Sequence, residues 1–281
     1  APGKLILMGE HAVVYGHPAL AMAVNRGTTV TLSERAGSTA LHQSTISDPR
    51  LMQAIHALLP AQGVSVHIDS DLPMGRGMGS SAALAVALAR ASMAWQGLPM
   101  TDERIDARAF AVERIFHGNP SGIDHTVSMR GGTLRYQKGP TSPMFTDIQV
   151  PRLPIVVIDS GSAGNTAEMV EYVRNHLDSV HNYIEQIGAL VEDALPAMMA
   201  GDLNAIGHAW NENHLLLRAI GVSNPTLDAI VRMAVDAGAY GAKMAGAGGG
   251  GVVIALTPDP IALLEKAQAN QWSAFQIFLH T

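Results

Sequence analysis

Three glycines at alternate positions, Gly75, Gly77 and Gly79, are followed by Ser80 and Ser81 and then by an almost unbroken apolar run. Glycines let several backbone N–H groups converge on one anion, because they adopt backbone angles that other residues avoid. A helix that begins after such a turn adds unpaired N–H groups and the positive end of its dipole. The stretch predicts a phosphate site in which a serine hydroxyl can reach a phosphate-bound Mg²⁺. The alternative is a tight turn with Ser80 as an ordinary N-cap.

The glycine turn matches neither of the two commonest nucleotide motifs. No lysine follows its glycines, as a Walker A loop requires, and Ser80 stands where a Rossmann turn has its third glycine. A second cluster, KMAGAGGGGVVIAL at 243–256, contains GxGxxG at Gly246, Gly248 and Gly251. A nicotinamide-dependent oxidoreductase would need a strand before these glycines and a helix after them, whereas the pattern indicates the reverse. We expect the cluster to pack against a ligand or the first loop, because so many glycines destabilise a free hairpin.

Lys4, Glu10 and His11 surround a short apolar strand near the start of the sequence. They are candidates for a polar site. The alternative is that the two charges are solvated at the strand ends, as single charges usually are, and that His11 is a structural hydrogen-bonding group.

The segment AVERIFHGNPSGIDHTVS, residues 111–128, carries two further carboxylates. Glu113 lies on a predicted helix with His117 one turn later on the same face, a pair that can bind a metal but is more often a surface pair. The turn GNPSGID presents Asp124, which suits a general base or a metal ligand, or alternatively caps the residues that follow. With the phosphate loop and Lys4, these groups form a set for phosphoryl transfer, which needs charge neutralisation and positioning more than covalent chemistry.

The elements that must hold these residues are strands and helices of ordinary length. A helix over 102–117 is expected to begin at Thr101 as N-cap and to end before Gly118. The proline-rich stretch GPTSPMFTDIQVPRLP marks a boundary between domains 1–150 and 151–281. The other expected strands are 5–8, 28–32, 64–68, 131–136, 155–159 and 252–256, and the other expected helices are 80–96, 165–176, 178–200, 202–217, 225–237 and 259–269.

Composition excludes several classes of protein. The 281 residues are 47% hydrophobic and 15% charged, which indicates a compact globular chain. The net charge of −6 gives no global basic field, so we expect neither nucleic acid nor a membrane as a partner. The absence of cysteine excludes disulfides and thiolate chemistry. The first residues show no signal-peptide pattern and no apolar stretch reaches bilayer length, so a cytoplasmic location is expected.

Four stretches together are similar to the motifs of the GHMP small-molecule kinases. APGKLILMGEHAVVYGHPALA resembles the first motif, DLPMGRGMGSSAALAVA the phosphate loop, and KMAGAGGGGVVIAL the third motif. ERIFHGNPSGIDHTVS resembles the stretch that carries the catalytic carboxylates. GEHAVVYG favours the members that phosphorylate mevalonate over the galactose type. The resemblance implies an α+β fold with two domains, an N-terminal α/β domain with a left-handed βαβ unit and a C-terminal ferredoxin-like domain.

The resemblance also implies a reaction and a site. ATP and Mg²⁺ would phosphorylate the C5 hydroxyl of mevalonate, with Asp124 as the base and Lys4 stabilising the attacking oxygen. Ser81 and Glu113 would hold Mg²⁺. The residues that would contact the phosphates are Gly75, Arg76, Gly77, Met78, Gly79, Ser80 and Ser81, and those that would contact mevalonate are Glu10, His11, Thr166, Gly246 and Ala247.

One departure from the family and two alternative functions stay open at this point. Ala245 stands where the family often has a hydroxyl residue, so one substrate contact differs. The first alternative is that the acceptor is that of a phosphomevalonate or homoserine-type kinase. The second is a non-catalytic nucleotide-binding regulator on the same fold, although such a protein has no chemical need for all four of Lys4, Ser81, Glu113 and Asp124. The apolar helical positions in the C-terminal half suit either a core or a homodimer face.

Overall fold

A computed structural model describes residues 1–118, 122–139 and 143–279. The chain forms two compact units, each described by itself below. The first unit consists of Ala1–Lys4, Ala23–Met74 and Met78–Gly131, and the second of Leu5–Met22, Gly75–Gly77 and Gly132–Thr281. Each unit combines several separate segments of the chain, whereas the predicted domains are two continuous ranges. The predicted domain boundary at residue 150 therefore stays a prediction.

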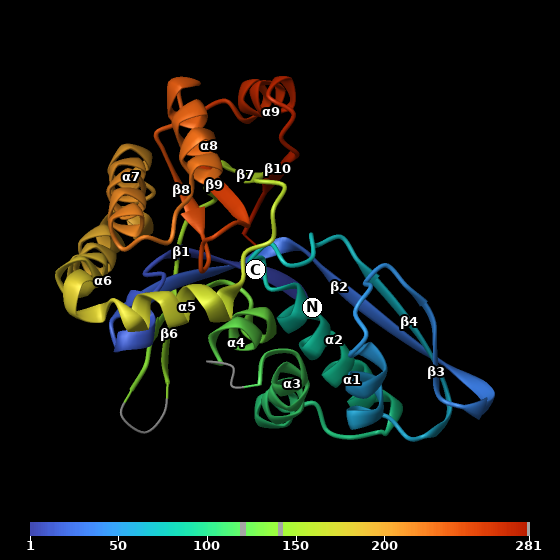
Figure 1. Cartoon of the computed structure of the whole chain (residues 1–281). Coiled ribbons are helices and arrows are strands. Elements are labelled where there is room, and N and C mark those ends of the chain that lie inside the picture. Colours follow the sequence, from blue (N-terminus) through green and yellow to red (C-terminus); the bar gives the residue numbers. More distant parts are fainter. Residues whose placement is uncertain (119–121, 140–142, 280–281) are drawn as a thin grey trace. The chain divides into compact units, whose positions relative to one another are not determined.

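In the first unit helices pack against a sheet through a shared apolar core (Figure 1). Residues 28–38 of β2 (Pro18–Ser38) pair antiparallel with β4 (Gln62–Ser70), from Thr28 opposite Ser70 onward, and β3 (Ala40–Ser44) pairs parallel with β4. The helix α1 (Leu51–Leu58) connects these two parallel strands, so the expected βαβ unit is present, and its left hand stays a prediction. The other helices are α2 (Ser80–Trp95), α3 (Asp102–His117) and α4 (Ile123–Arg130).

The helix α2 is buried on almost every side. Its sequence SSAALAVALARASMAW alternates alanine with larger apolar residues, and it packs against both α3 and α4. Alanine favours the helix and lets neighbouring helices approach closely. The first turn of α2 is therefore held rigidly by the core of this unit.

The second unit contains a four-stranded antiparallel sheet in the order β10-β7-β9-β8. In chain order these strands are the fourth, first, third and second, with helices after the first and third, which is the ferredoxin-like arrangement that the family resemblance implies. The strands and helices of this part are β7 (Ile155–Asp159), α5 (Thr166–Asn175), α6 (Leu177–Ala200), α7 (Leu203–Ala219), α8 (Pro225–Asp236), β8 (Gly241–Ala245), β9 (Val252–Leu256), α9 (Pro260–Ala269) and β10 (Ala274–Ile277).

The same unit contains residues 5–22 of the first motif, with the end of β1 and the start of β2. The strand β1 (Pro2–Met8) pairs with β2 and is followed by a short 3₁₀ helix, η1 (Ala12–Tyr15), which contacts α6. Residues 18–22 of β2 pair antiparallel with β5 (Thr133–Gln137), and β5 pairs with β6 (Met144–Ile148). The long strand β2 thus contributes its first part to the second unit and its last part to the first unit.

The outer strand β8 is covered by α7 through specific contacts. A Cβ on Gly241 would lie 2.0 Å from the Gly207 carbonyl oxygen, so the helix and the strand touch backbone to backbone. The Ala242 N–H donates to Asn211 Oδ1 at 3.0 Å, and the Met244 N–H donates to His214 Nδ1 at 3.4 Å. Two side chains one helical turn apart on α7 therefore accept hydrogen bonds from two amides of β8 that are two residues apart.

All the predicted strands and helices are present, with small differences at their ends, but the sequence missed several elements. Those missed are η1, β3, α1, α4, β6, β8 and β10, and β2 is far longer than the predicted 28–32. The strand β8 precedes the second glycine cluster, so the expectation that no strand does so is wrong, although a strand does follow it. Residues 119–121 of the predicted turn and 140–142 of the proline-rich stretch lie outside the described residues. None of the helices in the described part of the chain combines the length and apolar character that a membrane-spanning segment needs.

Candidate active site

Lys4 and Asp124 form an ion pair in the first unit. The Lys4 Nζ lies 2.8 Å from Asp124 Oδ1, and the two side chains are 4% and 37% exposed. A lysine buried to this degree needs a partner to offset the loss of hydration, and Asp124 supplies it. The alternative that Lys4 is a solvated strand-end charge is therefore wrong. Asp124 lies in the first turn of α4, where the helix dipole favours a carboxylate, and it keeps an exposed face for another group.

Gly79 is required beside this pair for two reasons. Its φ of +70° lies in the left-handed region. A Cβ at this position would also lie 2.8 Å from Lys4 Cγ. The Lys4 N–H donates to the Met78 carbonyl oxygen at 3.0 Å, which fixes the loop against β1. Met78 and Gly79, the last residues of the glycine turn before α2, thus pack directly against Lys4.

The N-terminus of α2 follows directly, with Gly79 as its N-cap and no side-chain capping bond. The alternative of Ser80 as the N-cap is therefore wrong, because Ser80 is the first helical residue and is itself buried. The first N–H groups of an α-helix have no partner within the helix and carry the positive end of its dipole. This end of α2 can therefore bind an anionic group, as the sequence predicts.

Glu113 is a buried carboxylate on α3, 2% exposed. Burial, and next the negative charge of Asp124, raise the pKa of Glu113 to about 7, against the smaller opposing effects of a hydrogen bond with Ser81 and the charge of Lys4. Its Oε1 has no hydrogen-bond partner among the described residues. A buried oxygen without a partner is unfavourable, so this atom is available to a ligand that offers positive charge.

Ser81 and Glu113 fit the Mg²⁺ that the family motifs imply. Hydroxyl and carboxylate oxygens are the hard donors that Mg²⁺ prefers, and this ion takes few protein ligands and completes its shell with phosphates and water. Within the described residues no three histidine, aspartate or glutamate side chains gather as a metal cluster. A site with two protein oxygens, one of them unpartnered, agrees with a nucleotide-bound Mg²⁺ rather than with a metal held by protein alone.

The first part of the glycine turn, Gly75–Gly77, packs in the second unit against the second glycine cluster. A Cβ on Gly77 would lie 3.3 Å from the Ala245 carbonyl oxygen, and a Cβ on Gly251 would lie 3.1 Å from the Arg76 carbonyl oxygen. The prediction that the second cluster packs against the first loop is confirmed for these residues. The Arg76 guanidinium bonds to Asp159 Oδ2 at 3.1 Å and to the Gly161 carbonyl oxygen at 3.2 Å, so the side chain anchors the turn.

Glu10 and Lys243 form a second buried ion pair, with side chains 1% and 0% exposed. The Lys243 Nζ also donates to the Met244 carbonyl oxygen at 2.7 Å, and Glu10 Oε2 has no partner within the described part of the chain. The alternative of a solvated charge at Glu10 is wrong. Instead the carboxylate ties the turn after β1 to β8, next to Ala245.

His11 lies beside this pair in a strained turn. Its φ of 61° and ψ of −47°, with a 2.7 Å bond from the Ala12 N–H to the Glu10 carbonyl oxygen, define a rare γ-turn. The imidazole Nε2 lies 2.8 Å from the Ala247 carbonyl oxygen. Burial lowers the pKa of His11, so the neutral ring is favoured and donates this bond. Gly246, with φ +94°, begins the loop that His11 contacts.

Thr166 is exposed at the start of α5, where the Asn165 side chain caps the helix by accepting from the Glu168 N–H at 3.3 Å. The structure thus groups Lys4, Ser81, Glu113 and Asp124 in the first unit. It groups Glu10, His11, Gly246 and Ala247 in the second. The roles of all these residues toward ligands stay predictions.

The sequence predicts no role for Lys243 or Asp159, which form ion pairs with Glu10 and Arg76. The available signal was a charged residue beside or within a buried apolar strand, because such a charge needs a partner. The helical spacing also indicated Glu113 as the neighbour of His117, whereas the His117 Nε2 lies 2.9 Å from Ser81 Oγ.

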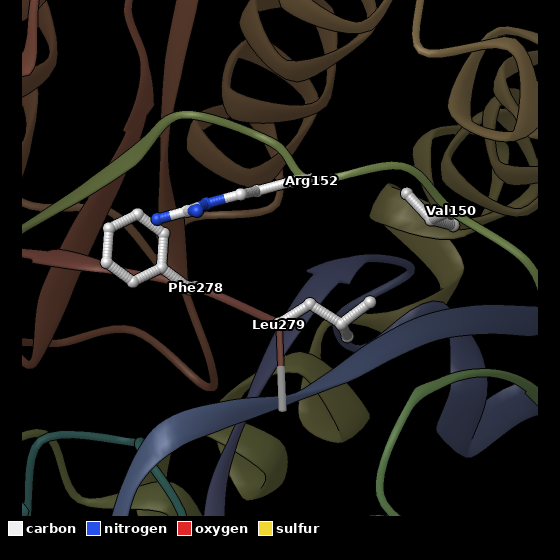
Figure 2. A pocket seen from close by; sticks show the side chains of 4 residues that line it. All are labelled: Val150, Arg152, Phe278 and Leu279. Atoms are coloured by element: carbon white, nitrogen blue, oxygen red, sulfur yellow. The ribbon is translucent and has the colours of Figure 1, made fainter. Parts of the chain in front are cut away.

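Two surface hollows lie elsewhere. One, of about 410 Å³, is lined by Val150, Arg152, Phe278 and Leu279, with the Arg152 guanidinium 3.8 Å from the centre of the Phe278 ring (Figure 2). The other, of about 510 Å³, is lined by Gln53, Ala111, Arg114, Ile115 and Gly118. Neither lining includes a predicted site residue.

Both parts of the chain are similar to known proteins. The family model described as GHMP kinases N terminal domain matches residues 48–132, and that described as GHMP kinases C terminal matches residues 194–272. The mevalonate kinases of Thermococcus sibiricus and Pyrococcus horikoshii are 38% and 37% identical to this chain, and both matches cover 92% of this chain and 88% of the relative. The crystal structure of L. major mevalonate kinase in complex with R-mevalonate superposes with a TM-score of 0.90 at 28% identity, covering 99% of this chain and 94% of that one.

Proposed function

The chain belongs to the GHMP kinase family, and we propose that it transfers the γ-phosphoryl group of ATP to the C5 hydroxyl of mevalonate. The observation that carries the proposal is the ion pair of Lys4 and Asp124 beside Ser81, Glu113 and the N-terminus of α2. This arrangement combines a base, a cation and an anion-binding helix end, which are the parts that phosphoryl transfer needs.

Asp124 acts as the base in this proposal. Its exposed face accepts the proton of the C5 hydroxyl while the hydroxyl oxygen forms a bond to the γ-phosphorus. The bond from that phosphorus to the bridging oxygen breaks, and ADP leaves with the electron pair. Lys4, 2.8 Å from Asp124, offsets negative charge on the attacking oxygen. Both groups are fixed by secondary structure, so the reacting atoms need little rearrangement.

The phosphates are held by main-chain N–H groups of the turn from Gly75 to Ser81. Ser81 and Glu113 hold Mg²⁺, which neutralises phosphate charge when it is bound. Because the Arg76 side chain is paired with Asp159, its main-chain N–H is the group that we assign to the nucleotide.

Mevalonate contacts are assigned to the second unit. We place its polar groups against Glu10, His11, Gly246, Ala247 and Thr166, as the family motifs imply. Two observations support this placement. Glu10 Oε2 has no partner among the described residues and can accept a hydrogen bond, and the neutral His11 ring is a polar group beside it. Since Ala245 has no hydroxyl to contact mevalonate, we assign this polar contact to the backbone of the second glycine cluster. A cytoplasmic location and a homodimer stay predictions.

An acceptor screen tests this function. The purified protein is incubated with Mg²⁺ and ATP and, in separate reactions, with mevalonate, phosphomevalonate, homoserine and galactose. ADP release is followed, and the product is identified by mass spectrometry and by phosphorus–proton coupling to C5. We expect phosphorylation of mevalonate alone. Transfer to phosphomevalonate or homoserine would move the chain to another branch of the family, and transfer to none, with ADP binding retained, would favour a regulator.

A further inference from the structure

His117 contacts the hydroxyl group that is assigned to the metal. It lies at the end of α3, one turn after Glu113, and its Nε2 is 2.9 Å from Ser81 Oγ. Ser81 also interacts with the Glu113 carboxylate, so an imidazole and a carboxylate both lie near the hydroxyl. The residue spacing alone allowed His117 and Glu113 to be a metal pair or, more often, a surface pair, but the imidazole Nε2 contacts Ser81 instead.

The end of α3 is held in place by a separate anchor. The Arg50 Nη1 donates to the Phe116 carbonyl oxygen at 2.7 Å, and the Arg50 guanidinium lies 5.1 Å from the centre of the Phe116 ring. Asp48 in turn bonds Arg50 at 2.7 Å. The main chain next to His117 is thereby fixed, which keeps the imidazole in position opposite Ser81.

A serine hydroxyl has one proton and two lone pairs. When a lone pair binds a cation, the proton must point away from the cation and needs an acceptor of its own. Glu113 cannot serve both purposes equally well, because its carboxylate is assigned to the same cation. His117 Nε2, with the ring proton on Nδ1, can accept the Ser81 proton without approaching the metal.

We propose that His117 is a positioning residue that accepts the Ser81 hydroxyl proton and so turns a Ser81 lone pair toward Mg²⁺. The inference rests on the metal roles of Ser81 and Glu113 in the proposed function. It follows the general rule that a partner behind a metal ligand fixes its orientation and raises its basicity, and that losing such a partner lowers metal affinity by about 10–100-fold.

Three variants at one position separate the acceptor from the space that the ring fills. His117→Phe keeps the ring without an acceptor, His117→Gln carries an oxygen near the place of Nε2, and His117→Asn reaches only as far as Nδ1. The readout is the Mg²⁺ concentration at half-maximal ADP binding, measured by calorimetry in the absence of any acceptor. We expect a rise of about tenfold for Phe and Asn and substantial recovery for Gln.

A double-mutant cycle tests whether His117 acts through Ser81. In a Ser81→Ala background the hydroxyl is absent, so His117→Phe is expected to cause no further change in the Mg²⁺ midpoint. A matched control is His56→Phe, at an exposed histidine on α1, with an unchanged midpoint expected. Thermal unfolding without Mg²⁺ verifies that each variant folds.

The outcomes distinguish the proposal from its rivals. An unchanged midpoint in His117→Phe, or the same loss with and without the Ser81 hydroxyl, overturns it, and the second result would indicate that His117 binds the metal directly. If His117→Phe does not fold, equal midpoints for the Gln and Asn variants overturn it instead. Failure of the proposed function is separate, because it appears as no phosphorylation of mevalonate while Mg²⁺-dependent ADP binding persists.

Discussion

Replacing Glu113 by glutamine should change how the stability of the fold depends on pH. Burial and the charge of Asp124 raise the pKa of Glu113 from 4.5 to about 7, so near pH 6 the native state holds a proton that the unfolded chain has released. Glutamine has nearly the same shape and cannot ionise. The comparison therefore isolates the free energy of ionising a carboxylate at this position.

The sign and size follow from the two pKa values. Because the native pKa is raised, the contribution of Glu113 is fully present below pH 4.5 and is lost as the pH rises through about 7. At about 1.4 kcal/mol for each pH unit over that interval, the loss reaches about 3 kcal/mol. The glutamine variant has no such loss. Its free energy of unfolding, relative to wild type, should rise by up to that amount between pH 4.5 and about 8.

Urea unfolding at a series of pH values, without nucleotide and with a chelator present, measures this difference. Other titrating groups occur in both proteins and cancel. Glu103→Gln, on the exposed first turn of the same helix, is the matched control. Hydrogen bonds lower the pKa of Glu103, so its variant should show no rise with pH over the interval. A flat or falling difference for Glu113→Gln would refute the assignment of a buried carboxylate that resists ionisation.

Further predictions concern the base and the second unit. Asp124→Asn should lower kcat by about 10²–10⁴-fold in steady-state assays while calorimetry shows nearly unchanged ADP binding, and near-normal turnover would exclude the base role. Lys243→Met leaves the buried Glu10 unpaired and should cost about 3–5 kcal/mol in urea unfolding, much of which the added Glu10→Gln should restore. Burial lowers the pKa of His214 from 6.5 to about 4, so its contribution is present above pH 6.5 and lost as the pH falls through about 4. His214→Gln should remove that acid-side slope.

The sequence predicts elements well where their apolar pattern is regular. The helix 102–117 coincides with α3, and 178–200 differs from α6 (Leu177–Ala200) by one residue at its start. The helix α4 (Ile123–Arg130) has no such pattern, because its buried face includes His125 and Ser128. Polar residues that are buried by tertiary contacts look like a turn when only their own segment is considered.

The same distinction between local pattern and tertiary contact applies to the residues of the candidate site. Ser81 and Asp124 could be found because each belongs to a local motif whose glycines determine the nearby backbone. The partner of Glu10 could not, because Lys243 lies 233 residues away in the chain and is brought close only when the second unit folds. Arg76 and Asp159 are likewise joined only in the folded unit.

The contacts between α7 and β8 have a consequence for association between molecules. An outer strand normally presents free amides on which another chain can build an additional strand. Here Asn211 and His214 already accept the amides of Ala242 and Met244, and the helix backbone touches Gly241. This side of the sheet is therefore closed to intermolecular strand addition, which protects the protein from aggregation through that edge.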